Sequence, residues 1–434
     1  MAFFEISIRA NGVRFMKPRK LLSSLGAAAV AAAIILTFMA PAFAVEKEKV
    51  IYSFKGGNDE GFPYSGLVLD SAGNLYGTTC GGGSEIYYGT AYKLMLTKAG
   101  GWKIDVLHIF TGATDGSCPR AGLIRDRAGS LYGTTTAGGN LNFCNGLGCG
   151  TVFKLSPTSH GRWKETVLYS FTDENDGGHP YAGLVFDSAG NLYGTTLTGG
   201  QNTGVVFKLS RRSNGKWKEK VIHAFTGAGA DGEFPYGGLI FDSAGNLYGT
   251  TSQGGGTANK GTAFKLSLGS TGWEETTLYS FTGGTDGGNP LAGLVMDEQG
   301  NLYGTTSVGG AAGNGLVFEL MPSSNGWTES VLYAFNGNND GRFPHAGVIF
   351  DTAGNLYGTN FYGGTVDGTV FELTPGPQGW SETVLYGFTG GADGGEPEAG
   401  LILDKTGNLY GTASVGGALG WGCVFRVQPG SGNK

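Results

Sequence analysis

Seven residues, each directly after a proline, carry side chains that could together bind a polar ligand. They are Tyr64, Arg120, Tyr181, Tyr236, Leu291, His345 and Glu398. Tyrosine offers apolar area with a hydrogen-bonding tip, and arginine and glutamate can orient polar groups. Around one opening, this set suits a polar ring-shaped ligand such as a sugar. The alternative is that these side chains only fill a channel.

Two carboxylates in this region raise the question of catalysis. Glu396 and Glu398 could form the acid pair that cleaves glycosidic bonds, although any ring of acidic loops offers such a pair. The five histidines form no HExxH motif, there is no GxSxG turn, and His179 and His345 have no evident Cys–Tyr partner for a copper-radical site. We therefore expect a non-enzymatic binding or scaffold module without cofactor. A carbohydrate-active enzyme, hydrolase or lyase, is the alternative, and a purely structural envelope component is the third reading.

A second set of seven residues consists of aspartates, each four positions before one of these prolines. They are Asp59, Asp115, Asp176, Asp231, Asp286, Asp340 and Asp393. A ring of carboxylates could hold Ca²⁺ or attract cationic ligands. In six of the seven, glycine follows the aspartate, and Asp-Gly closes tight turns. Because Ca²⁺ needs six to eight converging oxygens, we favour the turn.

The five cysteines favour disulfides in an exported chain. Cys144 and Cys149 lie five positions apart in the segment NLNFCNGLGCG and can staple it, and Cys80 can pair with Cys118. Cys423 is then left free and buried. The spacing CNGLGC does not indicate zinc, because no second ligand pair accompanies it, and we expect no metal site.

The elements that must position these residues repeat along the chain. The triplet LYG occurs seven times at spacings of 53 to 61 residues, which indicates a solenoid, a propeller or an array. Its tyrosines are Tyr76, Tyr132, Tyr193, Tyr248, Tyr303, Tyr357 and Tyr410.

Each repeat contains four short apolar or alternating runs, which predict four strands, a to d. In the third copy these are residues 182–187, 191–196, 204–209 and 220–225. Between strands a and b, Asp187 to Gly190 (DSAG) reads as a hairpin turn. Strands c and d are joined by a linker with a tryptophan in six copies: Trp102, Trp163, Trp217, Trp273, Trp327 and Trp380.

The sheets must cover one another, because strand a is apolar without alternation. The first and last copies are as apolar as the middle ones, so a closed ring is favoured over an open stack with polar ends. The segment 50–54 matches strand d, which the seventh copy lacks after residues 423–427. We predict an all-β fold, one seven-bladed β-propeller over residues 45–434, closed by this N-terminal strand. Its d–a and b–c loops share one face, which places the seven residues after proline and Trp421 at the channel mouth.

The run LYGTT-x-x-GG, followed by an apolar strand and a linker tryptophan, resembles the kelch class of propeller repeat. The whole unit more closely resembles the GloVer-type (Gloeo–Verruco) tandem repeat, over about residues 46–428. The resemblance implies an exported repeat protein and no particular ligand. Such proteins often carry a C-terminal surface anchor, which the ending SGNK after the last repeat does not favour.

The N-terminus has the pattern of a signal peptide. Arg14, Lys17, Arg19 and Lys20 form a basic segment before an apolar run over residues 21–40, and AFA at 42–44 fits a cleavage site, with Met16 as an alternative start. The other interpretation is an uncleaved membrane anchor. After removal of residues 1–44, 24 basic and 34 acidic residues give a net charge of −10. We expect a secreted protein, extracellular or periplasmic, monomeric, without a membrane span and without nucleic acid as partner. A glycan or a surface protein remains as its partner.

Overall fold

The computed structural model describes residues 48–81, 88–363 and 367–430. The chain divides into two units, Met1–Glu46 and Lys47–Lys434. The predicted signal peptide lies outside the described residues. Among the residues that are described, no helix is long and apolar enough to cross a membrane.

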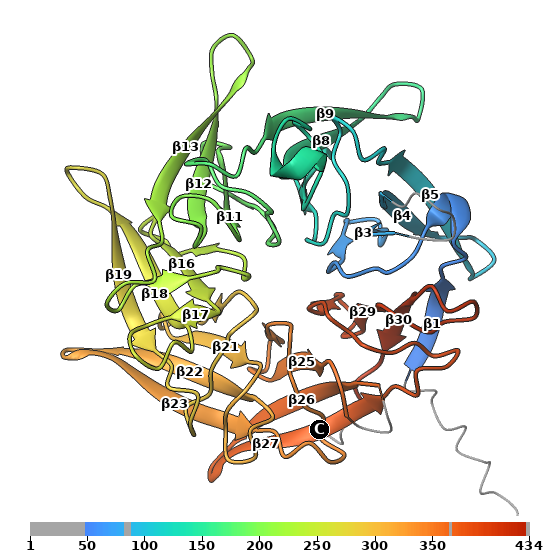
Figure 1. Cartoon of the computed structure of the whole chain (residues 1–434). Helices are drawn as coiled ribbons and strands as arrows, with labels where there is room; N and C mark the ends of the chain where they lie inside the picture. Colours follow the sequence, from blue (N-terminus) through green and yellow to red (C-terminus); the bar gives the residue numbers. More distant parts are fainter. Residues whose placement is uncertain (1–47, 82–87, 364–366, 431–434) are drawn as a thin grey trace, which may run out of the picture. The chain divides into compact units, whose positions relative to one another are not determined.

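The second unit consists of seven four-stranded antiparallel sheets arranged in a ring (Figure 1). In chain order, the first sheet contains β2 (Val68–Leu69), β3 (Leu75–Thr79), β4 (Thr90–Leu96) and β5 (Trp102–Ile109), and the second contains β6 (Ile124–Arg125), β7 (Leu131–Thr135), β8 (Thr151–Pro157) and β9 (Trp163–Ser170). The third contains β10 (Val185–Phe186), β11 (Leu192–Thr196), β12 (Val205–Arg211) and β13 (Trp217–Ala224), and the fourth contains β15 (Ile240–Phe241), β16 (Leu247–Thr251), β18 (Thr262–Leu268) and β19 (Trp273–Ser280). The fifth contains β20 (Val295–Met296), β21 (Leu302–Thr306), β22 (Leu316–Ser323) and β23 (Gly326–Ala334), and the sixth contains β24 (Ile349–Phe350), β25 (Leu356–Asn360), β26 (Thr369–Gly376) and β27 (Gly379–Gly387). Each sheet is one blade, and the predicted seven-bladed propeller is confirmed.

The seventh blade joins both ends of this unit. It contains β28 (Ile402–Leu403), β29 (Leu409–Ala413), β30 (Cys423–Val427) and β1 (Glu48–Ser53). β1 runs antiparallel to β30, with Glu48 opposite Val427 and Ser53 opposite Cys423. Figure 1 shows the blue β1 beside the red β30. The predicted closure of the ring by the N-terminal strand is therefore confirmed.

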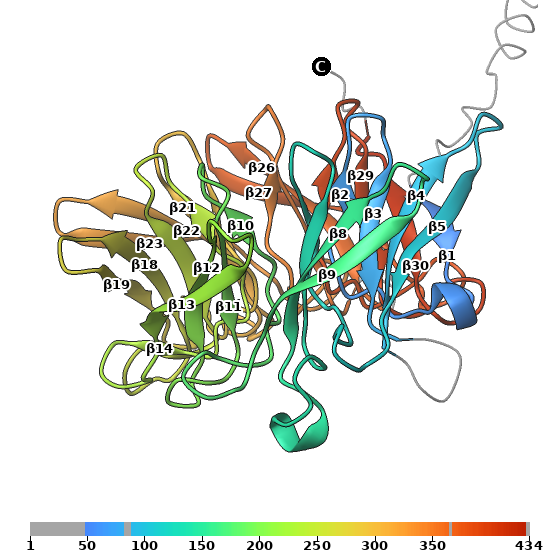
Figure 2. The ribbon, with the colours of Figure 1, turned by 90° about the horizontal axis from the view of Figure 1, so that it is seen from above.

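Several short elements lie within the loops on one face of the ring. They are the 3-10 turns η2 (Gly57–Asp59) and η3 (Cys144–Gly146) and a small ladder of β14 (Gly232–Glu233) with β17 (Gln253–Gly254). In the side view of Figure 2, β14 lies on the lower face of the ring.

Two details differ from the predicted strands. Strand a is only two residues long, as in β10, and the residues before it lie outside the ladder. There the carbonyl of Ala182 accepts a hydrogen bond from Thr134 of the preceding blade, at 3.1 Å. The tryptophans of the predicted c–d linkers belong to strand d instead, and Trp217, for example, opens β13.

The repeated decamer DSAGNLYGTT builds both a turn and a contact between blades. Asp187 accepts hydrogen bonds from the N–H groups of Ala189 and Asn191, from the Asn191 amide and from the Tyr193 hydroxyl. Burial alone would raise the pKa of Asp187, but these bonds outweigh it and hold the pKa below its usual value. The predicted hairpin turn is confirmed.

Close packing explains why the third residue of the LYG triplet is glycine. A Cβ on Gly194 would lie 2.7 Å from Cζ of Phe207, so this position of the strand admits no side chain.

The first threonine of LYGTT links each blade to the next. Its hydroxyl donates to a main-chain carbonyl at the entry of the neighbouring blade. The seven equivalent bonds are Thr78 to Ala121, Thr134 to Ala182, Thr195 to Gly237, Thr250 to Ala292, Thr305 to Ala346, Thr359 to Ala399 and Thr412 to Ser65. The last bond joins the seventh blade to the first, so the same contact runs around the whole ring.

Loss of one such hydroxyl should be measurable. In Thr195→Val the carbonyl of Gly237 loses this donor inside the protein, and we expect the free energy of unfolding to fall by about 1–3 kcal/mol in a urea titration. Thr195→Ser, which keeps the hydroxyl, is the matched control and should lose less. An unchanged stability of Thr195→Val, or a larger loss in Thr195→Ser, would show that the methyl group matters more than the hydrogen bond.

The hydrophobic core lies between the blades. One cluster combines Tyr132 and Val152 of one blade with Leu184, Leu192 and Phe207 of the next. Aromatic rings also meet between blades: Phe171, which follows β9 of one blade, packs edge to face on Phe207 of the next blade at 5.1 Å. Each sheet therefore buries its apolar faces only against its neighbours, and no blade is self-sufficient.

Candidate functional site

The seven residues that follow proline meet at one cavity on the loop face. Tyr64, Arg120, Tyr181, Tyr236, Leu291, His345 and Glu398 all line it, together with Ser252, Gln253 and Asn289. The cavity volume is about 470 Å³. The chain enters each blade here, because the proline fixes the turn and the next residue begins the run toward strand a. The sequence-based placement of this set around one opening agrees with the structure.

Arg120 lies at the centre of the polar contacts. Its guanidinium stands over the ring of Tyr64 at 4.3 Å and over that of Tyr181 at 5.3 Å. Arg120 Nη1 is 3.9 Å from Glu398 Oε2, and the two side chains are 31% and 24% exposed. Tyr181 and Tyr236 meet edge to face at 5.4 Å. The contacts of Arg120 hold its guanidinium in place and leave it partly open to solvent.

His345 is a neutral member of the site. Its ring stacks on Phe361 at 4.4 Å. Burial lowers the pKa of His345 to about 4, so the ring carries no charge at pH 7. It can donate or accept a hydrogen bond but cannot repel Arg120.

The remaining titratable groups of the cavity divide into phenols and one carboxyl. Burial raises the pKa of both Tyr64 and Tyr236, which keeps the phenols protonated at neutral pH. Burial also raises the pKa of Glu398; Arg120 opposes this shift, and Glu396 adds to it. The cavity thus pairs one cation with one carboxyl among neutral hydrogen-bonding groups.

A second ring of residues, missed by the sequence reasoning, precedes the same prolines. All seven have φ between 50° and 57°: Phe62, Cys118, His179, Phe234, Asn289, Phe343 and Glu396. A residue before proline is ordinarily extended, so nothing in the sequence predicts this conformation. Main-chain hydrogen bonds fix it, as the His179 N–H donates to Cys149 at 2.8 Å and the His179 carbonyl accepts from Leu197 at 3.2 Å. The fixed bend sets the direction in which the following side chain enters the cavity.

Trp421 lies behind the cavity. It is not among the described residues that line the cavity. Its ring meets Phe62 edge to face at 5.4 Å, and Phe62 stacks on Tyr64 at 6.3 Å. Trp421 therefore supports Tyr64 through Phe62.

The side chain of each of the seven loop aspartates contacts a tyrosine or histidine of the strand d that precedes it. Five accept a hydrogen bond from the tyrosine of the preceding strand d, as Asp176 does from Tyr169 at 2.8 Å. Asp115 and Asp231 contact His108 at 3.1 Å and His223 at 3.4 Å instead. The contacts agree with the turn interpretation and with the structural role expected for both histidines.

Both predicted disulfides are present, and Cys423 is free and buried. Cys80–Cys118 joins a b–c loop to the loop that carries Arg120, and Cys144–Cys149 closes its own loop. The first bridge anchors the segment just before Pro119 and Arg120.

The sequence and the fold were compared with known proteins. The family model described as the Gloeobacter/Verrucomicrobia repeat matches residues 39–254 and 213–425. The chain belongs to this family. No curated protein matches this Gloeobacter/Verrucomicrobia repeat protein in sequence.

Among solved structures, the Gloeobacter/Verrucomicrobia repeat protein is similar in fold to parts of two larger proteins. A puromycin-hydrolysing peptidase of Mycobacterium tuberculosis matches with a TM-score of 0.52 and 12% identity, over 85% of this chain and 51% of the peptidase. PorZ, a surface component of the type-IX secretion system of Porphyromonas gingivalis, matches with a TM-score of 0.48 and 15% identity, over 88% of this chain and 48% of PorZ. The chain thus spans about half the length of both proteins. At these identities the likeness concerns the fold alone.

Proposed function

We propose that the protein is an exported, non-enzymatic module that binds a sugar-like ligand of a glycan in the mouth cavity. The observation that carries this proposal is the convergence of the seven positions after proline, where the copies differ, on one cavity of about 470 Å³. Most of the repeat is nearly uniform, so specific recognition belongs where the copies diverge. The volume falls in the range of roughly 300–1,000 Å³ that small-molecule sites occupy.

The chemistry of the lining suits a hydroxyl-rich ring. Tyr181 and Tyr236 offer apolar ring area with hydroxyl tips, on which the face of a sugar can pack. Arg120 and Glu398 supply donors and acceptors that are held in place by their mutual contact. Export is supported by the N-terminal signal-peptide pattern and the two disulfides.

A carbohydrate-active enzyme at the same mouth is the second candidate. It is favoured by Glu398, whose pKa is raised by burial and by Glu396, as a general acid requires. Arg120 works against it, because a cation 3.9 Å away favours the ionised carboxylate.

A glycan array with residues 45–434 is the first test, followed by calorimetric titration of any sugar that binds. We expect Arg120→Ala and Tyr181→Ala each to weaken binding at least about tenfold, since each removes a desolvated contact. Arg212→Ala, an exposed arginine on a c–d hairpin, is the matched control and should leave the affinity unchanged. Equal affinity in all three variants would place the ligand elsewhere, and an array without any binding would favour a purely structural role.

A measurement of polysaccharide cleavage distinguishes the binding module from the carbohydrate-active enzyme. Incubation with a polysaccharide panel should release no new reducing or unsaturated ends. Cleavage that disappears in Glu398→Gln would instead establish the enzyme.

A further inference from the structure

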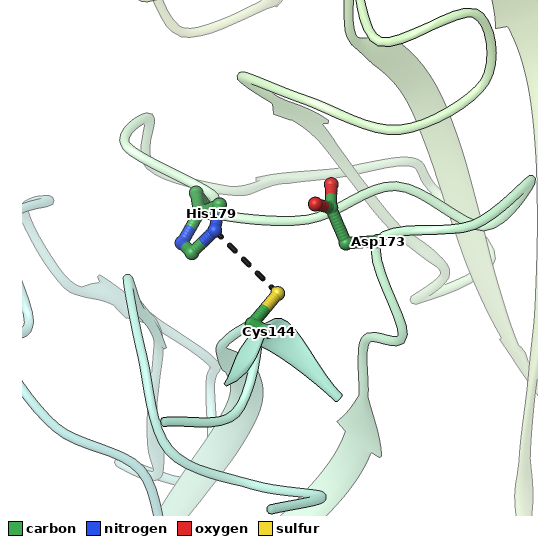
Figure 3. A group of neighbouring side chains, drawn as sticks. All are labelled: Cys144, Asp173 and His179. Carbon is green, nitrogen blue, oxygen red and sulfur yellow. Dashed lines mark hydrogen bonds between the residues drawn. The ribbon is translucent and has the colours of Figure 1, made fainter. Parts of the chain in front are cut away.

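Cysteine, histidine and aspartate side chains gather in two neighbouring loops (Figure 3), one of which also carries Tyr181 of the mouth cavity. One ligand atom each from Cys144, Asp173 and His179 lies within 4.8 Å of the other two. Cys149 adds a fourth donor atom, because its sulfur is bonded to that of Cys144. The sequence argues against zinc at CNGLGC for want of a second ligand pair. The fold supplies that pair, with His179 coming from 35 residues beyond Cys144.

The second pair is oriented by hydrogen bonds from outside the cluster. His179 Nδ1 lies 2.8 Å from the carbonyl oxygen of Thr136, so this nitrogen carries the hydrogen and donates it. Nε2 then presents its lone pair toward Cys144 Sγ, 3.6 Å away. The hydroxyl of Thr198 donates to Asp173 Oδ1. Such outer bonds to a histidine and a carboxylate are typical of metal ligands.

The distance between sulfur and nitrogen matches tetrahedral zinc coordination. Zinc lies about 2.3 Å from sulfur and about 2.0 Å from nitrogen, so a sulfur and a nitrogen ligand of one ion are separated by roughly 3.5 Å. The distance from Sγ to Nε2 is 3.6 Å. In the disulfide, the sulfur that faces Nε2 carries no hydrogen and is a poor ligand, whereas a thiolate is a strong one.

We propose that, when the Cys144–Cys149 disulfide is reduced, Cys144, Cys149, His179 and Asp173 bind one Zn²⁺. The disulfide and the metal are then alternative ways of closing the same loop. A mixed set of two sulfurs, one nitrogen and one oxygen selects zinc over Ca²⁺ or Mg²⁺, which prefer oxygen alone. The inference is independent of any glycan at the mouth.

A phosphine and one water molecule together reduce the Cys144–Cys149 disulfide. The phosphine takes the oxygen of one water and becomes a phosphine oxide, the S–S bond breaks, and the two hydrogens of that water go to the two sulfurs. Each thiol then gives up its proton on binding the ion, so two protons are released per Zn²⁺.

The test compares the full chain with Cys144→Ser. Both are reduced with a phosphine, which does not compete for zinc as a dithiol does, and equilibrated with Zn²⁺ or with Co²⁺ as a spectroscopic probe. We expect the reduced wild type to hold one equivalent more than Cys144→Ser, with thiolate–cobalt absorption in the Co²⁺ form. Metal held by Cys80 and Cys118 is present in both samples and cancels. The oxidised wild type should hold no metal at this site.

The histidine supplies the second control. His179→Asn should weaken metal binding at least about tenfold, whereas His160→Asn, an exposed histidine, should not. Circular dichroism reports whether each reduced sample keeps its β-sheet signal. Equal uptake in wild type and Cys144→Ser, full affinity in His179→Asn, or uptake only after loss of the β-sheet signal would each overturn the proposal.

Discussion

Phe54→Ala should destabilise the protein by about 3–5 kcal/mol, as much as the same change in the middle of the ring. Phe54 follows β1 directly and is fully buried. It packs against Tyr92 of the first blade, at 5.2 Å, in a cluster that also contains Val424 of the seventh. Phe281, which holds the equivalent place after β19, is also fully buried and packs against Phe318 at 5.0 Å.

The comparison of Phe54→Ala with Phe281→Ala tests ring closure directly. In a closed ring both positions are interior and should lose similar free energies of unfolding in a denaturant titration. In an open stack Phe54 would belong to a loose terminus, and its loss would cost almost nothing. Leu96→Ala is the control for a solvent-facing side chain, since Leu96 is 59% exposed, and should change stability by less than about 0.5 kcal/mol.

The melting temperature should fall as pH rises from 5 to 8. Burial raises the pKa of Glu165, Glu219, Glu329 and Glu382 to about 7, and a loop aspartate of the neighbouring blade raises each further. Because these pKa values exceed the usual 4.5, the folded state holds protons that the unfolded state has lost between pH 4.5 and 7. Stability therefore declines across that window and levels off above it.

Other groups act in the same pH range or below it. Burial lowers the pKa of His345 to about 4, so His345 opposes the glutamates between pH 4 and 6.5. Burial also lowers the pKa of His108, which acts in the same direction below pH 6.5. The turn aspartates have lowered pKa values, with Asp404 at about 2, and stabilise the fold only above those values. The glutamates outnumber the two histidines, so the maximum should lie near pH 5, with a fall of roughly 5 °C or more by pH 8.

Calorimetry of two variants tests whether the glutamates cause the pH dependence of the melting temperature. The double variant Glu329→Gln/Glu382→Gln should flatten the decline, because an amide does not ionise. Glu274→Gln, on an exposed part of β19, should leave the profile unchanged. A melting temperature that rises from pH 5 to 8 in the wild type would show that these carboxyls are ionised in the folded state.

Local rules explain how much the sequence could predict. The turn after Asp187 and the place of Tyr181 depend on a few neighbouring residues, and both were predictable. The two-residue length of strand a was not, because Ala182, the first residue of the predicted strand, accepts a hydrogen bond from Thr134 of another blade. The place of Trp421 behind Phe62 depends on side-chain packing between loops. The cluster of Cys144 and His179 joins two loops whose approach no local pattern encodes.

The bend before each proline has a consequence for how such proteins diversify. In all seven blades the bend holds the main chain in one course, with φ between 50° and 57°, whether the residue is Phe, Cys, His, Asn or Glu. The next residue can therefore be exchanged without reshaping the loop. One substitution per blade therefore changes the lining of the mouth cavity while the course of the main chain stays as it is.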